Sequence, residues 1–268
     1  MGESSRETIR LKEQTEKSFG FEWNKFNAVF PEYEANFLSY IDPIDAKFLF
    51  SKLVLDAGCG AGRHAYFAGK YGAEVIAIDA SDRAVLMAME NTKSQLRVKV
   101  AKVDIYDLPE NWKGMFGYVM AIGVLHHLPD PQDGFNRLVS MLEPGGSISI
   151  WVYSGEDNKL ATRLYEPARK ITTRIPHWLL YWLALPLAVT MEIVNRLRLP
   201  VFRHYRRFPF RTKWNDAFDV FSAPSAKYYT LEDIQGWYEQ AGLKDVRVSY
   251  RMLDGVAKGI KGLGVKVC

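Results

Sequence analysis

Apolar runs alternate with segments of helical periodicity through the first part of the chain. Short apolar runs with the length and composition of buried strands lie at residues 52–56, 74–79, 97–103, 116–122 and 147–153. Helix signals separate them, at residues 63–71, 81–91 and 132–142. Because strands that alternate with helices form right-handed βαβ units, the pattern predicts a parallel sheet covered by helices on both faces.

This alternation stops after Tyr153 and resumes at Thr230, which is expected to cap a helix over residues 231–240. A strand is predicted over residues 246–250. The glycine-containing tail, residues 254–267, is expected to add a last strand antiparallel to its neighbours. The predicted organisation is an aromatic helical lid over residues 1–50, an α/β domain over 51–154 and 226–268, and a helical cap inserted at 155–225.

The composition is that of a globular protein. The 268 residues are 48% hydrophobic, 13% aromatic and 25% charged, which excludes a disordered or low-complexity chain. The cysteines are Cys59 and Cys268, too few for a disulfide framework and without zinc-ligand spacing, so a reducing compartment and no metal site are expected. Residues 1–10 are polar and carry no secretory signal, which favours a cytoplasmic location.

The net charge of +4 is unevenly distributed. Residues 155–215 carry 12 Lys and Arg against 4 Asp and Glu, and the rest of the chain is net acidic. Within this segment residues 175–191 lack charged side chains, and as a helix they would be about 25 Å long, shorter than the roughly 30 Å hydrocarbon core of a bilayer. Basic residues interleaved with aromatic ones follow, at Arg196, Arg198, Arg203, Arg206, Arg207, Arg211 and Lys213.

Three functions remain open for this insertion. It could be a cap whose apolar helix, with Leu179, Leu180 and Leu183 turned inward, closes a substrate pocket. It could instead be a surface element in which residues 175–213 contact an anionic membrane. Binding of single-stranded RNA is the least favoured of the three, because the segment has no RNA-module signature and the rest of the chain is acidic.

A glycine turn follows the first predicted strand. The sequence Ala57-Gly-Cys-Gly-Ala-Gly62 stands between that strand and a helix, where glycines let a ligand approach the backbone and its free N–H groups. The dinucleotide fingerprint requires Gly or Ala at the position of Arg63, which argues against pyrophosphate binding. Asp56 would also repel a diphosphate, and it suits a ligand with a cationic amino-acid group.

Two more carboxylates end the next two predicted strands. Asp79 follows the second strand and can accept hydrogen bonds from two ribose hydroxyls, whereas Asp104 follows the third and can accept one from an adenine amino group. A single strand-end Asp is more often a capping residue than a ligand-binding one. Because the carboxyl ends of parallel strands meet at the ligand-binding edge of a sheet, the three acids together indicate a nucleoside site.

Four segments together resemble the class I S-adenosylmethionine-dependent methyltransferases, nearest the small-molecule group that includes quinone methyltransferases. They are residues 54–62, 78–81, 103–104 and 123–130. The resemblance extends over residues 52–153 and resumes at 228–267. It implies a Rossmann-like α/β fold with a seven-stranded, mostly parallel sheet, the last strand inserted antiparallel, and S-adenosylmethionine as the cofactor.

The resemblance also implies a set of cofactor-binding residues along the glycine turn and the strand ends. It places Asp56, Gly58, Cys59 and Gly60 at the methionine part, Asp79 and Ala80 at the ribose, and Asp104 and Ile105 at the adenine, with Gly123 as a further cofactor-binding residue.

Two adjacent histidines are candidate general bases. His126 and His127 come directly after the fourth strand, where substrate should meet cofactor, and a hydroxyl acceptor benefits from a base with a pKa near neutrality. The alternative is that one of them packs structurally. The sequence presents no competing cysteine nucleophile, paired-carboxylate motif or metal constellation.

The aromatic residues of the N-terminal segment need a surface to pack against. The open edge of the sheet offers one, so Trp23 and Tyr33 are predicted to line the acceptor pocket together with Tyr228 and Tyr229. The sequence thus predicts a methyltransferase that acts on a small-molecule or lipid-like acceptor. The alternatives are a non-catalytic, membrane-associated protein that retained the nucleoside pocket, and an NAD-dependent dehydrogenase.

Overall fold

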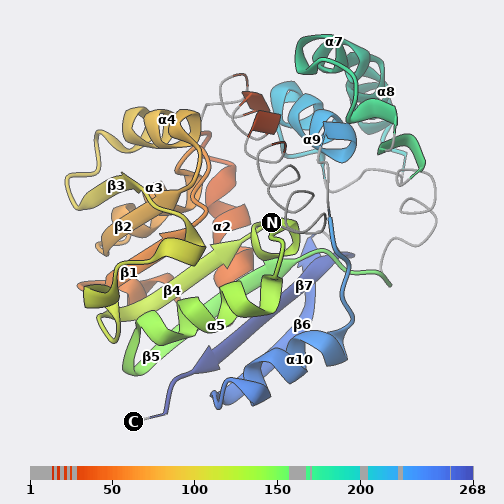
Figure 1. The fold of residues 1–268 in the computed structure, drawn as a ribbon. Coiled ribbons are helices and arrows are strands. Elements are labelled where there is room, and N and C mark those ends of the chain that lie inside the picture. The colour runs from red at the N-terminus through yellow and green to blue at the C-terminus, as the bar shows by residue number, and fades with distance from the viewer. Residues whose placement is uncertain are drawn as a thin grey trace, which may run out of the picture.

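Seven strands form one sheet in the order β3-β2-β1-β4-β5-β7-β6 (Figure 1). The structure is a computed structural model that describes residues 29–156, 167–169, 171–199, 205–222, 226–253 and 255–267, and residues 14, 17, 18, 21, 22 and 25. The strands are β1 Leu53–Ala57, β2 Glu74–Asp79, β3 Val98–Lys102, β4 Phe116–Ile122, β5 Leu142–Val152, β6 Lys244–Leu253 and β7 Val256–Val265.

The direction of the last strand agrees with the expectation. β7 pairs antiparallel with both β5 and β6, and the pairs among β1 to β5 are parallel. The Rossmann-like sheet with its last strand inserted antiparallel is therefore confirmed. The carboxyl ends of β1, β2, β3 and β4 lie at the same edge, and this edge carries the glycine turn and the strand-end acids.

Helices cover both faces of the sheet (Figure 1). One face carries α2, α3 and α4, and the other carries α5 and α10; their bounds are Tyr33–Ile41, Arg63–Lys70, Asp82–Thr92, Pro131–Met141 and Leu231–Gln240. Successive side chains of a strand point to opposite faces, so Val54 packs with Phe37 and Phe67 whereas Leu55 packs with Phe135. Each face thus has its own hydrophobic core.

Side-chain caps begin two of these helices where the sequence indicates them. The Ser81 hydroxyl accepts a hydrogen bond from Ala84 N at the start of α4. Thr230 and Asp233 form a reciprocal capping box at the start of α10. Each cap satisfies backbone N–H groups that the first helical turn leaves without partners.

The inserted segment forms three further helices whose bounds the structure describes, besides helical residues at 167–169 and 171–172. They are α7 His177–Leu183, α8 Leu185–Arg196 and α9 Phe210–Ser222, and they lie beyond the carboxyl ends of the parallel strands (Figure 1). Leu180 and Ala188 of the first two helices pack against Phe218 of α9 in a separate apolar cluster. We call these three helices the cap.

The structure differs from the expectation that Leu179, Leu180 and Leu183 all turn inward to close a substrate pocket. Leu180 is buried, but Leu179 and Leu183 are exposed because only one side of α7 contacts α9. Lys213, counted with the basic cluster in the sequence, is buried, and its Nζ donates to Glu192 Oε2 at 2.8 Å and to Phe208 O at 2.7 Å. Lys213 is therefore part of the packing between α8 and α9.

Candidate functional site

A cavity of about 480 Å³ lies between the carboxyl ends of the parallel strands and the cap. This volume is within the range of about 300–1,000 Å³ that is usual for small-molecule sites. Its walls come from the glycine turn, the ends of β2 and β5, the loops after β3 and β4, α2 and α9. The cap and the ligand-binding edge of the sheet thus enclose one continuous space.

The glycine turn forms the floor of this cavity. Gly58, Gly60 and Gly62 have φ values of +73°, +53° and +76°, a region that glycine adopts without strain. A Cβ atom at Gly58 would lie 2.4 Å from Cγ2 of Val124, so packing also requires glycine there. Gly58 N and Cys59 N both donate to Ile78 O at 2.8 Å, which ties the turn to β2.

Asp79 stands on the cavity wall at the end of β2 and holds the turn in place. Its Oδ2 accepts from Gly60 N at 2.9 Å and its Oδ1 accepts from Ser81 N at 2.9 Å. Each carboxylate oxygen has two lone pairs, so Asp79 keeps the capacity to accept from ligand hydroxyls. Burial raises the pKa of Asp79, and the N–H groups of Ser81 and Gly60 counteract part of that rise. Ala80 lines the cavity beside it.

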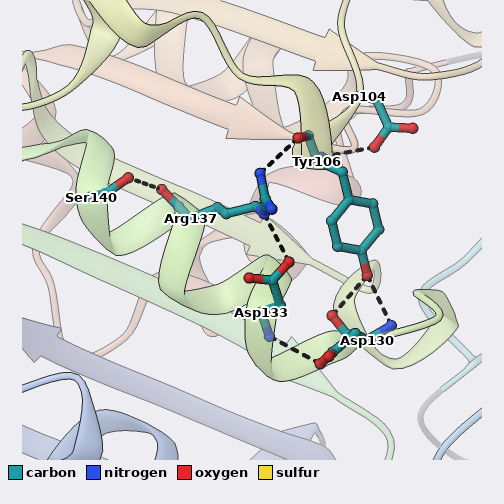
Figure 2. A network of polar contacts seen from close by, with 6 residues as sticks. All are labelled: Asp104, Tyr106, Asp130, Asp133, Arg137 and Ser140. Carbon is teal, nitrogen blue, oxygen red and sulfur yellow. Dashed lines mark hydrogen bonds and ion pairs between the residues drawn. The ribbon is translucent and has the colours of Figure 1, made fainter.

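A hydrogen-bond network fixes the wall after β3 (Figure 2). Asp104 Oδ1 accepts from Tyr106 N at 2.9 Å, and the Tyr106 hydroxyl donates to Asp130 O at 2.7 Å. Arg137 donates to Tyr106 O at 2.8 Å and to Asp133 Oδ2 at 2.8 Å. The loop after β3 is thereby held against the start of α5, and its cavity-lining residues are Asp104, Ile105 and Tyr106.

The two candidate histidines have different positions. His127 lines the cavity, together with Gly123 from the same loop, whereas His126 is fully buried and is not among the lining residues. The His126 ring packs 4.0 Å from the Tyr153 ring, measured between centroids. Burial, with His127 and Arg169 nearby, lowers the pKa of His126 well below its usual value. His126 is thus a neutral packed residue, and the structure brings only His127 of the pair to the cavity.

Asp56 lies beneath the glycine turn. Its carboxylate accepts from Ala65 N and is not among the cavity-lining groups, whereas the sequence placed it at the methionine part of the cofactor. Burial and, to a smaller extent, the nearby charge of Asp79 raise the pKa of Asp56 to about 7.

Cys59 does line the cavity. Burial and the carboxylates of Asp79 and Asp56 raise the pKa of its thiol, so Cys59 is not a reactive thiolate.

The predicted aromatic wall is partly present. Tyr33 lines the cavity and its hydroxyl lies 2.7 Å from Thr212 Oγ1 of α9. Tyr228 also lines it and accepts from Arg169 Nη1 at 2.9 Å. Tyr229 is not among the lining residues and instead packs against the core on Trp237, with ring centroids 4.9 Å apart, while its backbone forms a bridge with Ser154. Trp23 lies outside the described residues.

Three acidic residues on the cap side of the cavity were missed by the sequence analysis. Glu22, Asp216 and Asp219 all line it. The Tyr205 hydroxyl donates to Asp216 Oδ2 at 2.7 Å, and the Tyr153 hydroxyl donates to Asp219 Oδ2 at 3.0 Å. The sequence offered one signal, the spacing of three residues that places Asp216 and Asp219 on one side of a helix. It could not indicate that Glu22 joins them.

Comparison with known proteins identifies sequences and structures that this chain resembles. Residues 54–146 match the model of a methyltransferase domain. A ubiquinone biosynthesis O-methyltransferase of Chromobacterium violaceum is 30% identical over 52% of this chain and 59% of its own length. An uncharacterized Synechococcus protein is 28% identical over 71% of this chain and 46% of its own length, so the chain spans about half the length of these curated relatives.

A solved structure resembles nearly the whole chain. The magnesium protoporphyrin IX methyltransferase of Synechocystis, solved with bound S-adenosylhomocysteine, superposes with a TM-score of 0.60 over 97% of this chain and 99% of its own, at 14% identity. This chain contains a class I S-adenosylmethionine-dependent methyltransferase domain. The matched segment of the methyltransferase domain runs from the middle of β1 into β5 and includes the glycine turn, Asp79 and Asp104.

The residues of the methyltransferase domain fit its cofactor, S-adenosylmethionine. The turn places cavity-lining glycines, which have positive φ values and no side chain to block a ligand, next to Asp79. The oxygens of Asp79 can accept further hydrogen bonds. Asp104 and Tyr106 also line the cavity, directly beyond the end of the adjoining strand β3, and this is the edge at which such sheets bind nucleosides. These residues would hold the cofactor in one half of the cavity, and the half beside the cap, which we call the cap half, would be left for a second molecule.

Replacing Asp79 by Ala should weaken S-adenosylhomocysteine binding by about 1.5–3 kcal/mol, the range for hydrogen bonds to a charged group. The loss arises from the ribose contacts and from the loosened Gly60 N–H. Isothermal titration calorimetry measures it. Asp82→Ala is the matched control, because Asp82 is exposed and pairs with Lys102 outside the cavity. Equal affinities for the two folded variants would remove Asp79 from the cofactor site.

Asp56→Asn should stabilise the protein at neutral and alkaline pH. The folded-state pKa of Asp56 is about 7 against an ordinary value of 3.8, so stability falls as the pH rises between these values. At pH 8 the gain in the free energy of unfolding should be about 2–4 kcal/mol, from about 1.4 kcal/mol per pKa unit, and it should vanish near pH 4. Urea unfolding at both pH values checks this, and a gain independent of pH would contradict it.

Proposed function

We propose that this protein transfers a methyl group from S-adenosylmethionine to a hydroxyl group of a small, quinone-like ring compound. The observation that carries the proposal is the single cavity in which the glycine turn and Asp79 face the aromatic and acidic residues of the cap side. The names of the ubiquinone O-methyltransferase relatives support a quinone-like acceptor and an oxygen as the methylated atom. Neither a dehydrogenase nor a non-catalytic protein has support among the comparisons.

Methyl transfer makes modest demands on the protein. When bound, the cofactor supplies a methyl carbon already activated by a sulfonium, so the chain must mainly position the acceptor and exclude water. Tyr33 and Phe208 line the cap side of the cavity and are almost fully buried, which suits the exclusion of water from a bound acceptor. His127, in the loop after β4, and Tyr153, directly after β5, both line the cavity.

The direct test combines binding and product formation. The purified protein should bind S-adenosylmethionine in a calorimeter and should not bind NAD. With catechol as a simple ring acceptor, S-adenosylhomocysteine should accumulate in equal amount to the O-methylated ring, as measured by mass spectrometry. Binding of NAD would refute the proposed function. Failure to bind both S-adenosylmethionine and S-adenosylhomocysteine would also refute it.

We also propose that the outer side of α7 and α8 lies on an anionic membrane surface. Residues His177–Arg196 form the stretch of described helix that is long and apolar enough to cross a membrane, with a mean hydropathy of 1.4 and 22% of that window buried. Such a stretch is weak evidence of spanning. One side of it packs on α9, so an in-plane position on a membrane fits better than a crossing.

The exposed side combines apolar and basic residues. Trp178 and Trp182 are 62% and 57% exposed, and Leu183 and Ile193 are also exposed. Exposed arginines follow directly in the chain, at Arg196, Arg198, Arg206, Arg207 and Arg211. Tryptophan and leucine suit the headgroup boundary, and arginines attract anionic headgroups by about 1 kcal/mol each. A membrane position would bring the cavity close to a source of lipid-like acceptors.

The membrane proposal predicts cosedimentation with anionic phosphatidylglycerol vesicles at low salt. Binding should fall steeply at higher salt, because charge attraction is screened over roughly 10 Å at 0.1 M ionic strength. The double variant Trp178→Ser, Trp182→Ser should not pellet. Leu96→Ser is the matched control, because Leu96 is 95% exposed but lies between α4 and β3. Absence of the wild type from the anionic pellet at low salt would refute the proposal.

A further inference from the structure

The cap half of the cavity contains three carboxyl groups, of which Glu22 and Asp219 are only partly satisfied by the described residues. Asn215 Nδ2 donates to Glu22 Oε1 at 3.0 Å, and Tyr153 and Tyr205 donate to Asp219 and Asp216 as described above. Glu22 Oε2, Asp219 Oδ1 and Asn215 Oδ1 are buried and have no hydrogen-bond partner among the described residues. Glu22 is 2% exposed and Asn215 is 4% exposed, so bulk water does not satisfy them.

All three unsatisfied atoms are hydrogen-bond acceptors. A buried acceptor without a donor costs about 1–3 kcal/mol, so the arrangement favours a ligand that brings O–H or N–H groups. The three residues line the same cavity as the glycine turn. The unsatisfied oxygens are therefore a recognition feature for whatever occupies the cap half.

The charge balance distinguishes between kinds of donor. The cations that act on these carboxyls are Arg63, which lowers the pKa of Glu22 and Asp216, and Arg169, which lowers that of Asp219. Two guanidinium groups thus face three carboxyl groups. Burial raises the pKa of each carboxyl, and the charge of Asp219 raises that of Glu22 further. Because burial penalises any additional charge among these groups, the cap half of the cavity suits an uncharged ligand.

The surrounding walls indicate the shape of that ligand. Aromatic side chains along the cavity include Tyr33, Tyr40, Tyr153, Tyr205, Phe208 and Tyr228. Tyr153 and Tyr228 stack with ring centroids 5.9 Å apart and an interplanar angle of 27°. Flat aromatic walls with a few buried acceptors suit a planar ring that carries hydroxyl groups.

The position of Asp219 links it to the site of methyl transfer. It accepts its hydrogen bond from Tyr153, the residue directly after β5, and the strand next to β5 is β4, whose following loop brings His127 to the cavity. Asp219 is thus a cavity-lining carboxylate with one unsatisfied oxygen, and its hydrogen bond to Tyr153 links it to the strand ends that carry the other half of the cavity. The candidate histidine His126, by contrast, is enclosed by other rings.

We propose that a neutral ring hydroxyl donates its hydrogen bond to Oδ1 of Asp219, that Asp219 takes the proton during methyl transfer, and that Glu22 binds a second donor of the same ring. The proposal rests on the proposed function. The acceptor oxygen forms a bond to the methyl carbon while the carbon–sulfur bond breaks and its electron pair goes to sulfur. The proton of the acceptor hydroxyl passes to the Asp219 carboxylate, so the sulfonium charge disappears as the carboxylate is neutralised.

Catechol binding to the protein saturated with S-adenosylhomocysteine tests recognition without turnover. The wild type should bind catechol in a calorimeter and should bind the cationic probe benzylamine much more weakly. Asp219→Asn and Glu22→Gln should each weaken catechol binding about 3–10-fold, the loss of one hydrogen bond, with unchanged affinity for S-adenosylhomocysteine. Asp245→Asn is the matched control, because Asp245 is exposed and has a positive φ that asparagine adopts readily.

Turnover tests the proton transfer. At pH 7, Asp219→Asn should lower kcat for catechol about 100-fold or more, within the usual contribution of a general base. Its rate should then rise with pH as catechol ionises by itself, whereas the wild-type rate should depend less on pH and fall only where Asp219 becomes protonated. A structural role alone would not change the pH profile.

The outcomes separate this inference from the proposed function. Failure to bind any S-adenosyl compound would overturn the proposed function. Normal cofactor binding with catechol bound equally by the wild type, Asp219→Asn and Glu22→Gln would overturn the inference alone. Preference for benzylamine, or no binding of catechol, would overturn the inference that the ligand is a neutral ring with a hydroxyl group. An unchanged pH profile in Asp219→Asn would overturn the role of Asp219 as proton acceptor.

Discussion

The hydrogen bond from Gly60 N to the Asp79 carboxylate determines the shape of the ligand-binding edge. It joins the ends of β1 and β2 through a turn whose glycines have positive φ values, and the second oxygen of Asp79 holds Ser81 at the start of α4. Because the carboxylate is buried, it can maintain this arrangement only while both oxygens have donors. The cofactor half of the cavity is consequently preformed by the backbone.

Further contacts hold the remaining walls of the cavity next to that edge. The loop after β3 is held through Tyr106 and Arg137 against α5, and the loop after β4 packs Val124 where a side chain at Gly58 would stand. Together these contacts make half of the cavity rigid. The other half is built from α2, α9 and Glu22, which contact one another through side-chain hydrogen bonds such as Tyr33 to Thr212 and Asn215 to Glu22.

The cap holds buried charge at one face and exposed apolar surface at the other. Glu22, Asp216 and Asp219 require Arg63, Arg169 and tyrosine hydroxyls as partners, because unpaired buried carboxylates are strongly disfavoured. On the outer side Trp178 and Trp182 are more than half exposed. These features fit a cap that closes over an uncharged acceptor and faces an apolar environment, in agreement with both proposals.

Local sequence determined the α/β domain, because its signals act over a few residues. The apolar runs, the Ser81 and Thr230 caps, the glycine turn and the strand-end positions of Asp79 and Asp104 follow from propensity, periodicity and backbone sterics. Tertiary structure decided the rest. It buried His126 among rings, turned Tyr229 into the core, placed Asp56 below the turn, and brought Glu22 beside Asp219. Those outcomes depend on contacts between distant segments, whose burial and charge pairing no local pattern encodes.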